Sequence, residues 1–342
     1  MTDQVSCVVS RRQWLIRGAW GAAALAAGMP SRSRAQGDFP RGNFEVMIPT
    51  GAGGGAERIA RVFTQVWRKA LHNAAFEFEF QEGAGGLVGY RIYVERKPRD
   101  GYHLLFGNMG PETIGIALER PSFRFPEDFH YFCQVDVDDS VVFVRRDSRF
   151  RTIQQLVEEA RRRPVTVAVS RIPHPVSIGL LALGEETGAK FNLVPYGGGR
   201  PTMVAVINGE VDCGGLPAAN PIQLKDRVRV LGVFSDANPL GPMMENAPSI
   251  NKVFGTRIPD LPSARAWAIH TSVRERYPER YQLLVQTARQ VFSDPEFERL
   301  YRQTGAPWEA ITYGDAEACT RYVQRVVQLT ERYRDLLSGA KA

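Results

Sequence analysis

The chain has 342 residues, of which 44% are hydrophobic, and a formal net charge of +6. The first 35 residues hold five arginines and one aspartate, so the rest of the chain has a net charge of only +2. A chain so close to neutral lacks the basic surface expected of proteins that bind nucleic acid or anionic membranes. No repeat or low-complexity linker interrupts it, and its size is near that at which one core divides into domains.

Residues 1–35 have the features of a cleavable twin-arginine signal peptide. Ser10-Arg11-Arg12-Gln13-Trp14-Leu15 is the arginine pair in its serine-led context, and a weakly apolar stretch follows from Gly18 to Met29. Ser33-Arg34-Ala35 is a small-x-small cleavage site, so we expect the mature chain to begin near Gln36. The apolar stretch is too short and too rich in Gly and Ala to span a bilayer. The pattern favours export to the periplasm over a basic tail on a cytoplasmic protein.

The rest of the chain is organised around the segment Phe44–Leu71. Phe44–Ile48 is an apolar run that predicts a buried strand, and Pro49 ends it. The glycines of Gly51–Gly55 permit a tight turn and the close approach of a ligand to the backbone. Apolar residues at helical spacing from Glu57 onward predict a helix with one apolar face. Such a loop directs unpaired N–H groups at one point, which favours an anion there.

Two interpretations of this loop compete. The sequence of Gly51–Ala56 satisfies the dinucleotide fingerprint G-x-G-x-x-[GA], and Glu82 closes the next predicted strand where a ribose-binding acid belongs. The alternative function is therefore an exported NAD(P)-dependent oxidoreductase. The other interpretation is a carboxylate or phosphate bound at the mouth of a cleft. Against the first, Glu82 runs directly into a second glycine loop, and no acid/base set stands out downstream.

Further strands and helices alternate along the chain, as in an α/β fold. Apolar or alternating runs predict strands at Phe76–Phe80, Tyr102–Phe106, Val141–Val144, Val165–Val169, Phe191–Val194, within 209–217, and at Val228–Phe234. Helical spacing predicts helices at Tyr90–Arg96, Ile153–Arg163, Val176–Thr187, Thr202–Asn208, Pro278–Phe292, Pro295–Gln303 and Asp315–Leu337. The part after Phe234 is thus expected to be mostly helical. Several strands end in glycine loops, and in open α/β sheets ligands bind beyond the carboxyl ends of the strands.

Cysteine and histidine spacing gives no sign of a metal site. Cys7 lies in the leader, and Cys133, Cys213 and Cys319 stand far apart with no C-x-x-C motif. An odd number of cysteines in the mature chain argues against a full disulfide framework, although a single disulfide bridge is still possible. We expect neither a metal nor a cofactor.

The ordered set of motifs resembles the substrate-binding proteins of tripartite tricarboxylate transporters, the Bug-type periplasmic receptors. The likeness covers essentially the whole mature chain. The matching residues are Ile48-Pro49, Gly53-Gly54, Ala60-Arg61, Glu82–Gly86 with Gly89, Pro98, Asp100–Tyr102, Leu104-Leu105, Val194–Tyr196, Asn208–Asp212, Leu216-Pro217, Ala247–Ile250 and Asp294–Glu296.

This resemblance implies a type II periplasmic-binding-protein fold, with two α/β lobes, a ligand cleft between them and two crossing strands. One lobe would comprise residues 36–139 plus 262–342, and the other residues 140–261. Family ligands are mainly small carboxylates, with some amides among them. They are held largely by backbone groups of strand-end loops and passed to a membrane permease pair. The resemblance therefore implies a periplasmic solute receptor, not an enzyme, and we expect a monomer.

The expected ligand-binding residues lie in the strand-end loops of both lobes. They are Thr50, Gly51, Gly54, Gly55, Ala84, Gly85, Gly86, Asn108, Ser170, Arg171, His174, Ser177, Tyr196, Gly197, Gly214 and Gly215. Arg171 and Arg200 can each offer two donors to a carboxylate, although a loop arginine is more often simply solvated. The chain departs from the family here, since Arg171, Pro173, His174 and Pro175 stand where small hydroxyl residues are usual.

Other catalytic motifs are absent or incomplete. Pro175–Gly179 lacks the first glycine of a nucleophile elbow, which argues against a hydrolase. No G-x-x-x-x-G-K-[ST] motif occurs, which excludes a P-loop.

Overall fold

The computed structural model describes residues 39–338, and the elements below belong to this part of the chain. The strands are β1 (Phe44–Ile48), β2 (Phe76–Phe80), β3 (His103–Asn108), β4 (Phe129–Arg145), β5 (Val165–Val169), β6 (Phe191–Pro195), β7 (Cys213–Pro217), β8 (Val228–Val233), β9 (Pro262–His270) and β10 (Ile311–Asp315). The helices are α1 (Gly55–Trp67), α2 (Leu87–Arg96), α3 (Met109–Glu119), α4 (Ile153–Arg162), α5 (Pro175–Thr187), α6 (Gly199–Asn208), α7 (Ala219–Gln223), α8 (Ile250–Phe254), α9 (Thr271–Arg276), α10 (Pro278–Val291), α11 (Pro295–Gln303), α12 (Ala316–Arg332) and α13 (Arg334–Leu337).

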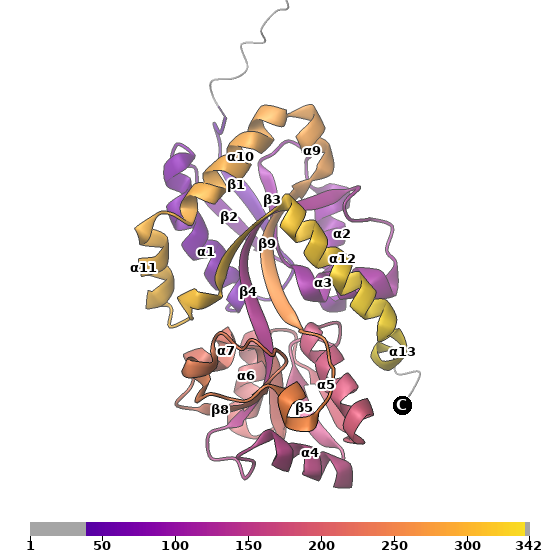
Figure 1. Ribbon diagram of the computed structural model, residues 1–342. Helices are drawn as coiled ribbons and strands as arrows, with labels where there is room; N and C mark the ends of the chain where they lie inside the picture. Colours follow the sequence, from indigo (N-terminus) through magenta and orange to yellow (C-terminus); the bar gives the residue numbers. More distant parts are fainter. Residues whose placement is uncertain (1–38, 339–342) are drawn as a thin grey trace, which may run out of the picture. The chain divides into compact units, whose positions relative to one another are not determined.

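The strands join in the order β2-β1-β3-β9-β4-β7-β5-β6, and β10 and β8 also pair with β4. The long strand β4 takes part in two sheets. Its first part, Phe129–Asp139, pairs with β9, and its second part, Ser140–Arg145, pairs with β7 and β8. We call the sheet on the β9 side the first lobe and the sheet on the β7 side the second lobe. Figure 1 shows β4 and β9 running side by side between them. The boundaries expected at 139/140 and 261/262 stay a prediction.

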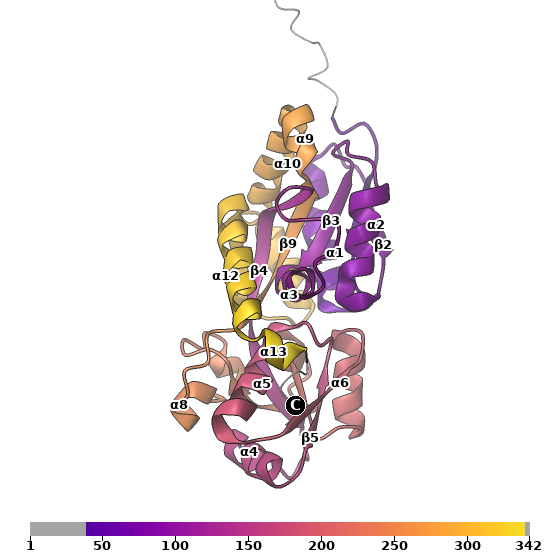
Figure 2. The same cartoon turned by 90° about the vertical axis from the view of Figure 1, so that its right-hand side faces the viewer.

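Parallel pairing directs several strand ends toward the same place. β1 pairs in parallel with β2 and β3, and β5 pairs in parallel with β6 and β7. In the first lobe α1 packs with α10 and α11. Helix α3 packs with α12 and with α2, and Figure 2 shows it between them. In the second lobe α6 packs against β4, β5 and β7, and α5 packs against β4, β6 and β7. The short helix α13 leaves the first lobe and packs against α5.

An aromatic core holds α1 against the first-lobe sheet. The ring of Trp67 lies 5.2 Å from that of Trp267 on β9 and 5.5 Å from that of Phe63. Trp67 is fully buried, as its position on the apolar helix face predicted. Its indole Nε1–H donates to Thr287 Oγ1 of α10 at 2.8 Å, which satisfies the polar atom of this buried ring.

Most predicted elements before residue 234 are confirmed within one to three residues. The two crossing strands that the resemblance implied are present, but the local sequence pattern missed most of their length. β4 was expected only at Val141–Val144, because Gln134, Asp136 and Asp138 interrupt its apolar pattern. β9 was not predicted at all, since Pro262–His270 is rich in alanine and carries Arg265 in its middle. Both strands are nearly fully buried, and the charges of Asp136 and Arg265 satisfy each other there.

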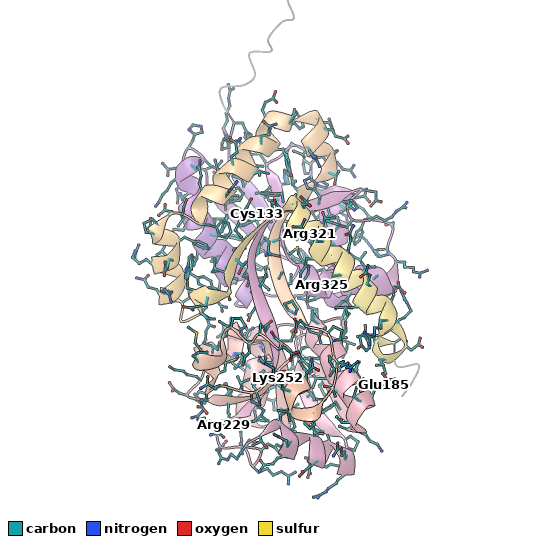
Figure 3. All side chains as sticks on the ribbon, in the orientation of Figure 1. Cys133, Glu185, Arg229, Lys252, Arg321 and Arg325 are labelled. Atoms are coloured by element: carbon teal, nitrogen blue, oxygen red, sulfur yellow. The ribbon has the colours of Figure 1, made fainter. Side chains whose placement is uncertain are left out.

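The three cysteines in the described part of the chain are free and buried, so no disulfide links them. Cys133 lies on β4 near α12 (Figure 3), and burial raises the pKa of its thiol. Within residues 39–338 no three His, Cys, Asp or Glu side chains gather as metal ligands would. No helix in the same range has the length and apolar character needed to cross a bilayer. The proposed leader lies outside the described residues.

Candidate functional site

A cavity of about 130 Å³ lies where strand ends of the two lobes meet. It is far larger than the ~10–15 Å³ that one water needs. The loops after β1, β2 and β3 line it from the first lobe, and those after β5, β6 and β7 line it from the second. The cavity thus occupies the place where open α/β sheets bind ligands.

Four helices begin at the cavity wall. The residues that precede the first turns of α1, α3, α5 and α6 are Gly54, Asn108, His174 and Gly198, and all four line the cavity. The first N–H groups of a helix have no partner within it, and they carry partial positive charge. In α5 these groups are already occupied, because Pro175 has no N–H and the N–H groups of Val176 and Ser177 bond to His174. The partial positive charge of the helix ends around one space favours a negatively charged group inside it.

One amide of the first glycine loop is already occupied. Gly53 N–H donates to Glu57 Oε2 at 2.5 Å, so the helix's own acid binds the loop. A pyrophosphate placed on this loop would meet that carboxylate, which is unfavourable for a dinucleotide. Gly53 has φ +82°, the left-handed region that glycine adopts without strain.

Arg171 ties the second lobe to the first. Its Nη1 donates to the backbone oxygen of Gly85 at 2.5 Å and to Glu112 Oε1 at 3.0 Å. Burial raises the pKa of Glu112 to about 7, although Arg171 acts in the opposite direction. Glu112 Oε2 has no partner among the described residues. Arg171 therefore lines the cavity with part of its charge already compensated.

Arg265 on β9 is the most deeply buried charge in the cavity wall, with 4% of its surface exposed. Its Nη1 forms a short ion pair with Asp136, and its Nε donates to Asn108 Oδ1 at 3.1 Å. Nearby, both carboxylate oxygens of Asp138 accept from Ala219 N–H, at 3.2 and 3.1 Å. Burial raises the pKa of Asp138 to about 7. The crossing strands therefore carry a compact group of buried charges.

His174 is buried and neutral at physiological pH. Its Nδ1 accepts from Val176 N–H at 3.2 Å, which caps α5. Burial lowers the pKa of His174 to about 3, with Arg171 and Arg265 acting in the same direction. Because Nδ1 is the acceptor, the single ring proton lies on Nε2, which makes that nitrogen a donor.

Two side chains of opposite charge lie where the lobes approach each other over the first glycine loop. A Cβ added to Gly51 would lie 2.0 Å from Glu82 Oε1, and one added to Gly197 would lie 3.8 Å from Glu82 Oε2. A Cβ added to Gly53 would lie 3.2 Å from Arg200 Nη1. Both side chains line the cavity and are exposed.

The structure brings together ten of the expected site residues in the cavity wall. They are Thr50, Gly51, Gly54, Gly55, Asn108, Ser170, Arg171, His174, Tyr196 and Gly197. The other six expected residues do not line the cavity, and they are Ala84, Gly85, Gly86, Ser177, Gly214 and Gly215.

Most of these six residues are engaged elsewhere. The Gly85 oxygen accepts from Arg171, whereas Ala84 is exposed. Ser177 is fully buried, and its Oγ donates to the Arg171 oxygen at 3.4 Å. A Cβ on Gly214 would meet Phe143, and one on Gly215 would meet Val176, so both glycines serve core packing.

Sequence reasoning missed that Arg265, Asn220 and Glu82 line the cavity. A signal for Arg265 existed, because an isolated arginine within Pro262–His270 has to be buried and paired if that segment is a strand. Asn220 follows β7 in the short helix α7 and carries no comparable signal.

The chain was compared with known proteins. The family model described as "Tripartite tricarboxylate transporter family receptor" matches residues 59–254. A protein of Agrobacterium vitis, described as "UPF0065 protein in the TAR-I ttuE-ttuC' intergenic region", is 28% identical over 186 residues, which are 54% of this chain and 53% of that protein. The chain thus spans about half the length of that curated relative.

Solved structures match over more of the chain. The periplasmic binding protein BugD matches with a TM-score of 0.75 and 21% identity, over 87% of this chain and 98% of its own. A protein of R. palustris with adipate matches with a TM-score of 0.75 and 20% identity, over 88% of this chain and 99% of its own. These likenesses confirm the predicted two-lobed α/β fold of type II periplasmic binding proteins. The matched family is one of transporter receptors rather than enzymes, so the oxidoreductase alternative is rejected.

Proposed function

The chain belongs to the tripartite tricarboxylate transporter receptor family, and on that premise we propose that it captures a small organic acid in the cavity between its lobes. The observation that carries this proposal is the convergence of four helix N-termini and the side chains of Arg171, Arg200 and Arg265 on one space. The adipate bound to the R. palustris neighbour is of the same chemical class.

Helix ends alone do not supply the affinity. A helix N-terminus contributes ~0.3–1 kcal/mol for an exposed anion and up to ~2 kcal/mol for a partly buried one. Micromolar binding requires about 8 kcal/mol, and one carboxylate cannot contact the first turns of all four helices. Hydrogen bonds from charged donors, each contributing about 1.5–3 kcal/mol, supply the remainder once water is excluded.

Closure of the two lobes around the ligand is part of the proposal. Arg171 from the second lobe already contacts Gly85 and Glu112 of the first lobe. Gln223 of α7 makes two further contacts with the first lobe. Its Oε1 accepts from Arg58 Nη1, and its Nε2 donates to the Thr304 oxygen. Hinge motion at β4 and β9 would open these contacts to admit the ligand.

We further propose that residues 1–35 are a cleavable twin-arginine signal peptide, that the mature receptor acts in the periplasm as a monomer, and that it delivers its ligand to a tripartite tricarboxylate-type permease. The leader motif at Arg11-Arg12 supports the export route.

Native mass spectrometry of the protein recovered from the periplasm tests these proposals together. We expect a chain beginning near Gln36 that carries the added mass of one organic acid, and we expect an Arg11→Lys/Arg12→Lys variant to stay in the cytoplasm.

Thermal melting in a panel of organic acids is the second experiment. The cognate acid should raise the melting temperature, because a hundredfold excess over Kd stabilises the folded state by about 2.7 kcal/mol. NAD and FAD are the negative controls. Melting that responds to a dinucleotide and to no acid would refute the receptor proposal.

A further inference from the structure

Arg265 is held in the cavity wall in a way that leaves one end of its guanidinium group available. Its backbone N–H donates to Asp136 Oδ1 at 2.9 Å, its Nη1 pairs with Asp136 Oδ2, and its Nε donates to Asn108 Oδ1. These bonds fix the plane of the group. They engage Nη1 and Nε and leave Nη2 for another partner.

The position of Nη2 is defined by the first residue of α1. A Cβ built on Gly55 would lie 3.2 Å from Arg265 Nη2 and 3.4 Å from Arg58 Nη2. Two guanidinium groups therefore flank the residue at which the helix begins, and Gly55 itself lines the cavity. A methyl group on Gly55 would be in tight contact with both cations, so the glycine lets them lie close to the helix N-terminus.

Arg58 adds a second guanidinium group with unsatisfied donors at this point. Its Nη1 donates to Gln223 Oε1 at 2.9 Å, whereas its Nε and Nη2 are buried and have no partner among the described residues. Burial lowers the pKa of Arg58, and the charge of Arg265 acts in the same direction. Unsatisfied charged donors are costly in a protein interior, and an anion beside them removes that cost.

We propose that Arg265, supported by Arg58, is the anchor for one carboxylate of the ligand, which lies against Arg265 Nη2 and the first-turn N–H groups of α1. This inference rests on the proposed function and makes it more specific: the ligand enters with an ionised carboxylate, and the uncharged amide of the same shape is rejected. Arg265 would distinguish ligands by charge as well as by shape. Both oxygens of a carboxylate can accept from the directed donors of a guanidinium group, whereas the nitrogen of an amide cannot accept.

The test compares diacids with their diamides. Succinate, glutarate and adipate are titrated against wild type and variants by calorimetry, alongside succinamide, glutaramide and adipamide. The main variant is Arg265→Gln/Asp136→Asn, which removes the charge without leaving Asp136 as an unpaired buried carboxylate. Arg229→Gln/Glu245→Gln is the control, because this ion pair lies outside the cavity and its removal, like that of the main pair, leaves the net charge unchanged.

We expect wild type and the Arg229 control to prefer acid over diamide, and the double variant to lose about 10–100-fold of that preference, the size of one charged hydrogen bond. Equal weakening of acid and diamide, with the preference kept, would mean that Arg265 is only structural and would overturn the proposal. In that case the receptor function itself would stand.

A second variant changes shape without changing charge. Gly55 has an ordinary backbone conformation, so Gly55→Ala adds no backbone strain, but its methyl group would enter the space between Arg265 and Arg58. We expect it to fold as wild type and to bind the acids at least about tenfold more weakly. Unchanged acid binding in this variant would contradict the proposed position of the carboxylate.

Bromide provides a measurement that does not depend on the choice of acid. Anomalous diffraction from wild-type crystals soaked in bromide should show an ion beside Arg265 Nη2, and crystals of the double variant should lack it. Bromide at other sites with none beside Arg265 would refute the anchor. Bromide beside Arg265 with no acid bound in any titration would support the anion site and reject the proposed organic-acid ligand.

Discussion

At the scale of single residues, the cavity wall combines charges that are paired with charges that are not. Arg171 and Arg265 are held by Glu112 and Asp136, both of which are fully buried. Glu82 and Arg200 instead lie in exposed positions near the first glycine loop. The paired charges set geometry, whereas the exposed ones adjust how strongly a ligand of given charge is attracted.

Glu82 gives the first prediction. The variant Glu82→Gln removes a negative charge from the wall and should strengthen the binding of a dianionic acid such as adipate by up to about fivefold, the scale of an exposed charge interaction. The gain should shrink in 0.5 M salt, because screening weakens exposed pairs. Calorimetry at two salt concentrations measures it.

The matched control for Glu82 is Glu158→Gln on α4. Glu158 is exposed, does not line the cavity and makes the same change in net charge. An equal gain in both variants would mean that the effect comes from net charge rather than from the position of Glu82.

At the scale of elements, α1 serves the site through its N-terminus and the core through its C-terminus. Gly54 and Gly55 line the cavity at one end, and Trp67 is anchored to α10 at the other. The aromatic core therefore fixes the direction in which the helix N–H groups point.

The Trp67–Thr287 bond gives the second prediction. Thr287→Val removes the acceptor and leaves a buried indole N–H without a partner, which should lower the free energy of unfolding by about 1–3 kcal/mol. Urea denaturation followed by tryptophan fluorescence measures the change. Thr320→Val on α12 is the control, because Thr320 makes the same bond to the backbone four residues back but holds no tryptophan. A loss no larger than that of the control would show that the indole bond contributes nothing.

At the scale of the whole molecule, buried titratable groups give opposing contributions to stability against pH. Burial lowers the pKa of His130 and His270 to about 4 and that of His174 to about 3. Below the unfolded histidine pKa of about 6.5 and above these lowered values, the unfolded chain binds more protons than the folded one. The histidines therefore make the fold less stable as the pH falls.

The buried carboxyl groups act in the opposite direction. Burial raises the pKa of Glu112 and Asp138 to about 7, so between their unfolded pKa values near 4 and pH 7 the folded state holds more protons than the unfolded state. The stability that these two groups contribute is lost as the pH rises through this range.

Glu112→Gln gives the third prediction. The variant removes one of the groups that oppose the histidines and keeps an amide that can accept from Arg171. The free energy of unfolding should therefore fall more steeply from pH 6.5 to pH 4.5 than it does in wild type. Urea titrations at several pH values measure this slope, which is independent of any constant loss caused by the substitution. A slope equal to that of wild type would mean that Glu112 is already ionised throughout this range.

Local patterns in the sequence were sufficient for most elements and for the loops that form the cavity. Val165–Val169 and Pro295–Gln303 have the predicted bounds, because strand alternation and helix caps are short-range signals. The glycine loops after β1 and β6 lie at the cavity as expected, since parallel strands bring their carboxyl ends to one edge.

Only the tertiary structure decided which groups carry charge into the site. Arg265 is bonded to Asp136, 129 residues away, and to Asn108, 157 residues away. No local sequence pattern encodes such long-range pairings. Unless the pairing of Arg265 is known, the charge of this residue argues against assigning β9 as a buried strand. The sequence by itself determined the α/β alternation and the glycine loop at the cavity, because these follow from neighbouring residues. Which buried arginine lies in the cavity wall depended on two crossing strands that burial and charge pairing hold together.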